Sequence, residues 1–116
     1  MPAKKSLGGV VISGKGEGKK YVEIYRDKIK DKLGFYPYLG TLNLKVGEIP
    51  DLDYDIIRGF WDYGGVKIAP CKIRGVKAYV VIPEKSRYKN VLELVSSSNL
   101  RKVLNLTDGD SVEVEF

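Results

Sequence analysis

The sequence contains no histidine and only one cysteine, Cys71. The absence of histidine excludes Ser-His-Asp and Cys-His catalysis, HExxH metalloproteases and zinc sites with histidine ligands. A single cysteine excludes zinc sites with paired cysteines and any internal disulfide, so the chain does not require an oxidising compartment. Any chemistry must therefore depend on Lys, Arg, carboxylates, hydroxyls, amides, backbone N–H groups or a hard metal ion. Cys71 itself is predicted to be a small core residue on a strand.

Long hydrophobic runs are also lacking. The apolar stretch from Leu7 to Ile12 is short and contains two glycines, and no run approaches the ~20 residues of a membrane-spanning helix. We therefore expect a cytoplasmic protein without a membrane partner. The 116 residues, 43% hydrophobic and 30% charged, fit one globular domain over residues 1–116. The sequence does not set the oligomeric state, for which a monomer is one expectation.

The net charge of +5 is concentrated in the N-terminal third of the chain. Residues 1–45 contain ten Lys or Arg against four Asp or Glu, whereas residues 46–70 contain two against five. This distribution favours an anionic partner, either a phosphate-bearing small molecule or a nucleic acid. A basic surface is equally common in proteins that bind no particular anion.

Short strands separated by turn residues dominate the predicted secondary structure. Strands are expected at residues 8–13, 41–46, 56–63, 66–73, 76–82 and 111–116, with a further strand or strand tail at 21–25. Gly64-Gly65 and Arg74-Gly75 are predicted to form tight turns between neighbouring strands. Pro70 cannot donate a hydrogen bond, so its strand is expected at a sheet edge or with a bulge.

Few residues show helical periodicity. Apolar residues at 25, 29 and 33 predict an amphipathic helix of about two turns that Gly34 ends. Residues 91–95 are predicted as a short helix, and residues 100–104 as another with a Ser or Asn cap. The strands are too closely spaced for repeated βαβ units. The predicted fold class is therefore mainly β, an antiparallel barrel with short helices at its ends.

The first candidate site is the glycine-rich segment Gly14-Lys-Gly-Glu-Gly-Lys-Lys20. Alternating glycines let the backbone approach a ligand closely and direct N–H groups toward it, as phosphate binding requires. The segment matches neither the P-loop nor the dinucleotide-binding fingerprint. A flexible hairpin loop with solvated lysines is the alternative.

Polar residues on two other segments are further candidates. Thr41 and Asn43 lie two apart on a predicted strand and share a face, where their oxygens suit Mg²⁺; an ordinary exposed strand face is the alternative. The capped helix that contains Arg101 offers N–H groups and a favourable dipole to an anion, or is simply a surface helix. Glu93, between two leucines, can hold a ligand hydroxyl or face solvent.

Six segments in order resemble the archaeal CTP-dependent riboflavin kinases. These segments are Gly14–Gly18, Leu33-Gly-Phe35 with Pro37-Tyr38, Gly40-Thr-Leu-Asn-Leu44, Gly65–Pro70, Ala78–Pro83, and Leu100-Arg101 with Asp108-Gly-Asp110. No single segment is decisive, but their order and spacing match over nearly the whole chain. The resemblance implies a six-stranded cradle-loop (RIFT-like) β-barrel that transfers the γ-phosphoryl group of CTP to the 5′-hydroxyl of riboflavin, which gives FMN and CDP.

The resemblance also implies roles for individual residues. It places Mg²⁺ on Thr41 and Asn43, and riboflavin at Ser86 and Glu93, with Glu93 a candidate acceptor for the proton of the attacking hydroxyl. The nucleotide contacts that it implies are Lys15, Gly16, Glu17, Gly18, Lys19, Lys20, Ser98, Asn99, Leu100 and Arg101. Phosphoryl transfer depends mainly on positioning and charge neutralisation, so the absence of histidine is no obstacle.

Two other functions remain open from the sequence. The segment 100–110, followed by an alternating strand, also resembles the swapped-hairpin, dimeric DNA-binding modules of bacterial transition-state regulators. Such a module usually occupies about half this length and leaves the glycine-rich segment unexplained, so no nucleic-acid partner is expected. A flavin carrier without catalysis is the third possibility.

Overall fold

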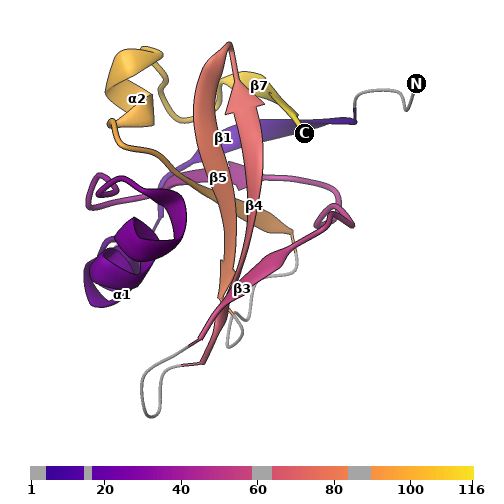
Figure 1. Cartoon of the computed structure of the whole chain (residues 1–116). Coiled ribbons are helices and arrows are strands. Elements are labelled where there is room, and N and C mark those ends of the chain that lie inside the picture. Colours follow the sequence, from indigo (N-terminus) through magenta and orange to yellow (C-terminus); the bar gives the residue numbers. More distant parts are fainter. Residues whose placement is uncertain (1–4, 15–16, 59–63, 84–89) are drawn as a thin grey trace.

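The strands of the chain form one antiparallel sheet, seen in a computed structural model that describes residues 5–14, 17–58, 64–83 and 90–116 (Figure 1). Its elements are β1 (Ser6–Ile12), α1 (Glu17–Leu33), β2 (Leu42–Lys45), β3 (Asp55–Ile57), β4 (Val66–Ile73), β5 (Val76–Pro83), β6 (Val91–Val95), α2 (Leu100–Val103) and β7 (Ser111–Glu115).

Six of these strands close into a barrel. The strand order is β3-β4-β5-β6-β2-β1-β7, and β7 also pairs with β4. The ring therefore consists of β4, β5, β6, β2, β1 and β7, in that order. Closure requires only two residue pairs between β4 and β7, Lys72 with Glu115 and Ile73 with Val114. β3 is added to the outside of the ring at the other end of β4. The six-stranded barrel predicted from the sequence is confirmed.

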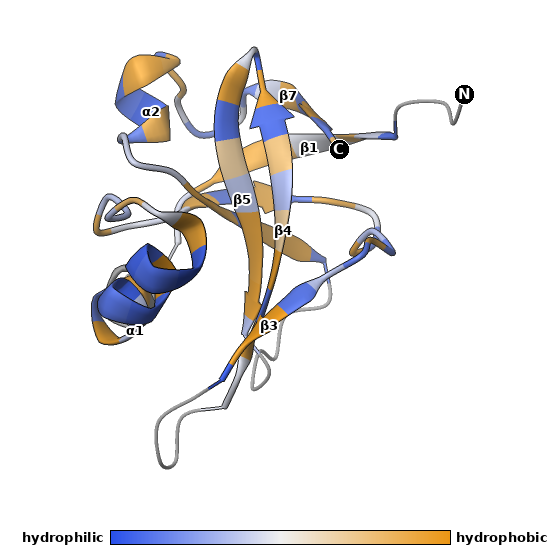
Figure 2. Ribbon diagram, viewed as in Figure 1, coloured by the Kyte–Doolittle hydropathy of each residue, from blue (hydrophilic) through white to orange (hydrophobic). Residues whose placement is uncertain are grey.

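The barrel interior is filled by alternate residues of every ring strand, as the period of two requires. In β2 and β7 strand burial alternates, and the inward side chains of the barrel form one apolar cluster. Figure 2 shows hydrophobic residues recurring along the barrel strands. Its fully enclosed members include Val11, Leu44, Ile73, Val80, Leu92, Leu94 and Val114. Cys71 belongs to the same cluster, and burial raises the pKa of its thiol to about 12. The thiol therefore stays protonated, and the prediction of a core cysteine is confirmed.

A second apolar cluster lies between α1 and the outer face of the sheet. Val22, Tyr25 and Ile29 project from one face of α1 and pack against Ile57 of β3 and Val81 of β5, among others. The remaining face of the helix is polar, and within the described part of the chain no helix is long and apolar enough to span a membrane. The sheet is thus buried on both faces where α1 crosses it, which fixes the helix against the barrel.

Helix α1 is longer than the sequence predicted. The strand or strand tail expected at residues 21–25 is wrong, because Glu17–Leu33 is one helix of 17 residues. Apolar positions 22, 25 and 29 are three and four residues apart, so they line up on a helix and not on a strand. The predicted end is confirmed: Gly34 has a φ of +84° and its N–H donates to the carbonyl of Lys30.

Two further predictions are corrected. Residues 91–95 form strand β6 and not a helix, because β2 and β5 both supply hydrogen-bonding neighbours and Leu92 and Leu94 fill the barrel. The strand expected at residues 56–63 is β3, which covers Asp55–Ile57; residues 59–63 lie outside the described residues.

The β4–β5 hairpin agrees with the sequence prediction. Arg74 and Gly75 both have positive φ, +48° and +80°, as a two-residue hairpin turn requires. Pro70 pairs with Tyr79 of β5. On its other side, β3 pairs with residues 66–68 of β4 and β7 with residues 72–73. Pro70 therefore lies in the gap where β4 has no second neighbour, so its missing N–H costs no sheet bond.

Candidate functional site

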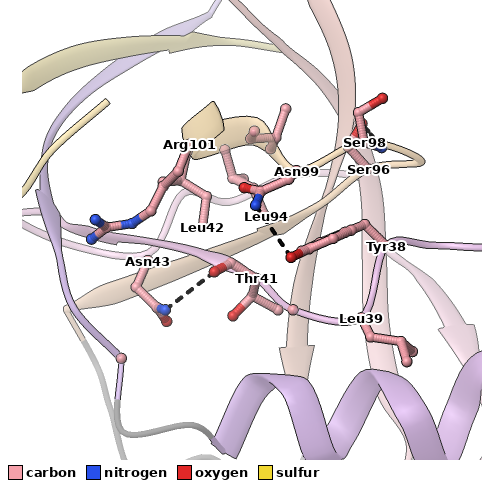
Figure 3. A pocket seen from close by; sticks show the side chains of 13 residues that line it. Tyr38, Leu39, Thr41, Leu42, Asn43, Leu94, Ser96, Ser98, Asn99 and Arg101 are labelled. Carbon is pink, nitrogen blue, oxygen red and sulfur yellow. Dashed lines mark hydrogen bonds between the residues drawn. The ribbon is translucent and has the colours of Figure 1, made fainter. Parts of the chain in front are cut away.

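A cavity of about 300 Å³ opens where β1 ends and β2 begins, below α2 (Figure 3). It brings together segments that are far apart in the sequence, because β2 pairs with both β1 and β6 and α2 follows β6. The lining residues are Gly14, Tyr38, Leu39, Gly40, Thr41, Leu42, Asn43, Leu94, Ser96, Ser98, Asn99, Leu100 and Arg101. Six residues predicted as site residues thus lie around one cavity: Thr41, Asn43, Ser98, Asn99, Leu100 and Arg101.

Thr41 and Asn43 lie on the same face of the β2 segment, outside the barrel interior. Both are half-buried and flank the buried Leu42, as predicted. The side-chain nitrogen Nδ2 of Asn43 lies 3.5 Å from the carbonyl oxygen of Thr41. Its side-chain oxygen Oδ1 accepts no hydrogen bond from a described residue. An added Cβ at Gly14 would lie only 2.5 Å from that nitrogen, so the position of the Asn43 side chain depends on glycine there.

The oxygens of this pair suit a hard cation. A hydroxyl and an amide oxygen are ligands that Mg²⁺ accepts when ligand phosphates and water complete its shell. Among the described residues, no cluster of three or more Asp, Glu, Cys or His side chains forms an alternative metal site. The residues present therefore fit a Mg²⁺ ion that is shared with a bound phosphate.

Glu93 lies directly across the sheet from Asn43. The two residues are register partners between β6 and β2, and Glu93 is also paired with Val81 of β5. Its neighbours Leu92 and Leu94 point into the barrel, so Glu93 faces outward and is half-buried on the face that carries Asn43. The structure thus places Glu93, one of the predicted flavin residues, beside Asn43, one of the predicted metal ligands.

Arg101 of α2 also lines the cavity. Its guanidinium donates to the carbonyl oxygen of Ile12 at 3.1 Å and forms an ion pair with Asp108, and Asp108 also accepts a hydrogen bond from the Ser13 hydroxyl. The Ser13 hydrogen bond and the nearby Arg101 guanidinium hold the pKa of Asp108 below its ordinary value. These contacts attach the end of β1, where the glycine-rich segment begins, to α2.

The upper rim of the cavity is formed by the turn before α2 and the segment around Tyr38. Asn99 is the N-cap of α2, as predicted: its Oδ1 accepts from the N–H of Lys102, and its Nδ2 donates to the Tyr38 hydroxyl at 3.2 Å. The buried Ser96 accepts from the N–H of Tyr38 through its carbonyl oxygen, at 2.8 Å. Two segments almost sixty residues apart are therefore fixed against each other.

Some predicted site residues cannot be placed in this way. Lys15, Gly16 and Ser86 lie outside the described residues. Glu17, Gly18, Lys19 and Lys20 form the first turn of α1 and not a loop, so the glycine-rich loop before the helix is shorter than predicted. The first turn of a helix presents N–H groups without intrahelical partners, which suits an anion.

Sequence reasoning gave no role to several residues of the site. Tyr38 and Asp108 lie within segments that resemble the kinase family, but only the folded chain shows what they contact. Ser13 and Asp108 are 95 residues apart, and no local pattern indicates that they bond. The importance of Gly14 as a contact of Asn43 likewise depends on the pairing of β1 with β2.

The chain matches one protein-family model over residues 11–116, which include the whole cavity. That model is named CTP-dep_RFKase and described as a domain of unknown function, DUF120. The chain belongs to this family.

Curated relatives carry the name riboflavin kinase. The chain is 41% identical to the protein of that name from Thermoplasma volcanium, over 92% of this chain and 55% of the relative. It is 43% identical to the one from Pyrobaculum aerophilum, over 93% and 59%, and 40% identical to the one from Ignicoccus hospitalis, over 94% and 69%. The chain thus spans a little over half the length of most of these relatives.

Proposed function

We propose that this domain is a CTP-dependent riboflavin kinase. The reaction transfers the γ-phosphoryl group of CTP to the 5′-hydroxyl of riboflavin, which gives FMN, CDP and a proton. The observation that carries the proposal is the single cavity that the family-matched chain builds from the segments around Thr41, Asn43 and Arg101. The names of the family and of the curated relatives supply the two substrates.

Arg101 and the N-terminal turn of α1 would bind the phosphates of the nucleotide. Arg101 lies at the cavity and is fixed by Ile12 and Asp108, so a phosphate meets a guanidinium already in place. The N–H groups of the first turn of α1, which lack intrahelical partners, add positive potential at the end of the glycine-rich segment. Lys15, Gly16, Lys19 and Lys20 belong to the same proposed phosphate site.

Thr41 and Asn43 would hold Mg²⁺ through Oγ1 and Oδ1, and Gly14 leaves the room that the Asn43 side chain needs. When bound, Mg²⁺ supplies charge neutralisation at the phosphate oxygens. Asn43 is kept in place by its contact with the Thr41 carbonyl. The site is thus organised before the nucleotide binds, which is how positioning contributes to phosphoryl transfer.

Glu93 would orient riboflavin, together with Ser86. Glu93 is the register partner of Asn43, so a hydroxyl held by its carboxylate would lie near the proposed metal site. In this position Glu93 accepts the proton of the 5′-hydroxyl as the oxygen attacks phosphorus. The proposal places the reaction in the cytoplasm, and the free, buried Cys71 is compatible with a reducing compartment.

The kinase is favoured over a DNA-binding module by the way in which the barrel closes. A swapped-hairpin module needs two copies to complete its barrel, whereas here six strands of one chain form the ring. The cavity with its oxygen pair and arginine also has no role in such a module.

The test is to incubate the protein with riboflavin and Mg²⁺ and with CTP, ATP, GTP or UTP in turn, and to separate FMN from riboflavin by chromatography. FMN formed with CTP and abolished by a chelator is the expected result. Riboflavin binding without FMN would instead indicate a flavin carrier. Binding to duplex DNA that weakens steeply with salt, with no FMN formed, would favour the regulator.

A further inference from the structure

The rim of the cavity carries a pair of hydrogen-bond donors for which the proposed phosphate and metal contacts give no role. Tyr38 is 45% exposed, yet its position is set from several directions. Its N–H donates to the carbonyl of Ser96, its carbonyl accepts from the N–H of Gly40 at 2.9 Å, and its hydroxyl accepts from Asn99. An exposed aromatic side chain held by polar contacts, without burial, is a preorganised feature of the cavity wall.

The orientation of the Asn99 amide is fixed by the backbone of α2. Its Oδ1 accepts from the N–H of Lys102 at 3.3 Å, so its Nδ2 must face Tyr38, to which it donates at 3.2 Å. This bond uses one of the two Nδ2 hydrogens and an acceptor lone pair of the Tyr38 hydroxyl. Among the described residues, the hydroxyl hydrogen of Tyr38 and the second Nδ2 hydrogen have no acceptor. The rim therefore presents two donors about one hydrogen-bond length apart.

We propose that Tyr38 and Asn99 together read the nucleobase and select cytosine over uracil. This inference rests on the proposed function, because it takes the phosphates to lie at Arg101 and the metal at Thr41 and Asn43. Figure 3 shows Arg101 and Asn43 at one end of the cavity and Tyr38 at the other, with Thr41 and Asn99 between them. A nucleotide whose phosphates occupy the first end places its base at the second.

The chemistry of the two pyrimidines explains the selection. Cytosine presents two adjacent acceptors, O2 and N3, whereas uracil carries a hydrogen on N3 and so presents a donor there. Two adjacent donors on the protein satisfy both acceptors of cytosine but place a donor against the N3–H of uracil. A site that leaves a polar group unpaired in this way discriminates strongly between otherwise similar ligands.

The test compares the dissociation constants of CDP and UDP by titration calorimetry, which requires no turnover. The parent is expected to bind CDP more tightly than UDP. Tyr38→Phe retains the ring and removes the hydroxyl, and it should lower the CDP-to-UDP preference by roughly 10-fold, the effect of one hydrogen bond that is lost or left unpaired. Asn99→Asp retains the cap of α2, since Asp is also a good N-cap, and replaces the donor by an acceptor that suits uracil. It should lower the same ratio at least as much, whatever the added charge does to both nucleotides.

Tyr36→Phe is the matched control, since Tyr36 is exposed, lies two residues upstream and does not line the cavity. It should retain the parental ratio. The inference is overturned if the parent does not discriminate between the two nucleotides, or if both site variants keep its ratio. The proposed function fails separately: a parent that prefers CDP but forms no FMN would leave base selection standing and exclude the kinase.

Discussion

Arg101 and Asp108 form an ion pair that joins α2 to the turn before β7, and both residues also contact the end of β1. Arg101 donates to the Ile12 carbonyl and Asp108 accepts from Ser13. The same turn is bonded to β1 through backbone bonds between Val11 and residues 109 and 110. The arginine proposed to bind phosphate is therefore positioned by the strand from which the glycine-rich segment extends.

Replacing Asp108 with Asn should weaken this arrangement without removing the barrel. Because the ion pair is half-exposed, we expect the KM for CTP to rise only a few-fold, the size of effect typical of surface pairs, with kcat little changed. Steady-state kinetics with CTP varied at saturating riboflavin would measure this. A fall in kcat with an unchanged KM would instead show that Arg101 contributes to the transition state and not to binding of CTP in the ground state.

The stability difference between the parent and Asp108→Asn should depend on pH. The pKa of Asp108 is lowered in the folded protein by Ser13 and Arg101, so ionised Asp108 stabilises the fold above the ordinary carboxyl pKa of about 4. That contribution is lost as the pH falls through the lowered pKa. Urea unfolding should therefore show the parent more stable than Asp108→Asn at pH 7, with the difference shrinking toward pH 3. An equal difference at both pH values would contradict this.

Gly14→Ala should damage the proposed metal site while leaving the fold intact. The added Cβ would lie 2.5 Å from Asn43 Nδ2, so the Asn43 side chain must move. We expect a higher Mg²⁺ concentration for half-maximal turnover and a normal circular dichroism spectrum. Gly47→Ala is the control, because nothing lies within 4 Å of a Cβ there. If the two variants share one Mg²⁺ dependence, Gly14 is not required for the site.

The packing of helix α1 against the sheet can be tested by measuring the free energy of unfolding. Ile29 is 2% exposed and packs against the outer face of the sheet, so Ile29→Ala should lower the free energy of unfolding by about 2–5 kcal/mol. Asp27→Ala, on the exposed side of the same helix, should change it by less than about 0.5 kcal/mol. Chemical denaturation of both variants provides the measurement, and a similar small effect for both would show that α1 does not pack as described.

The barrel could be predicted from the sequence because its signals are local. Alternating residues, the Arg74-Gly75 turn and Pro70 each constrain a strand through the backbone of a few neighbouring residues. Residues 91–95 were misassigned because a short apolar run suits either a strand or a buried helix, and only pairing with β2 and β5 decides between them. Residues 21–25 were misassigned because their aromatic and β-branched side chains also suit a strand, and only packing of Val22 and Tyr25 against the sheet decides for the helix.

The site could be predicted only in part, for a related reason. The family resemblance indicated Thr41, Asn43, Asn99 and Arg101, but what brings them together is the pairing of β2 with β1 and β6. Asp108 and Tyr38 each act on a residue at least seven positions away, and Tyr38 meets Asn99 across 61 residues. Such contacts follow from topology, so composition and spacing do not reveal them.

Glu93→Gln tests the proposed flavin contact. The substitution keeps the size of the side chain and removes its charge, so the nucleotide dissociation constant should be unchanged. Turnover should fall by roughly 10²-fold if the carboxylate accepts the hydroxyl proton, with a higher KM for riboflavin. Kinetics with riboflavin varied, together with calorimetry for CDP, would separate the two effects. An unchanged KM and kcat would return Glu93 to the role of a solvent-facing residue.

Thr41→Val and Asn43→Leu test whether the two oxygens bind the same ion. Thr41→Val is nearly isosteric, so it removes a ligand oxygen without opening a cavity, and turnover should fall by roughly 10²-fold or more. Raised Mg²⁺ should restore part of the activity if the loss is one of affinity. Thr41→Ser retains the hydroxyl and should keep the parental Mg²⁺ dependence. Because both side chains act on one ion, the double variant should lose less than the sum of the two single effects in free energy. Turnover against Mg²⁺ concentration decides the matter, since coincident curves for the parent and both single variants would show that neither side chain binds the metal.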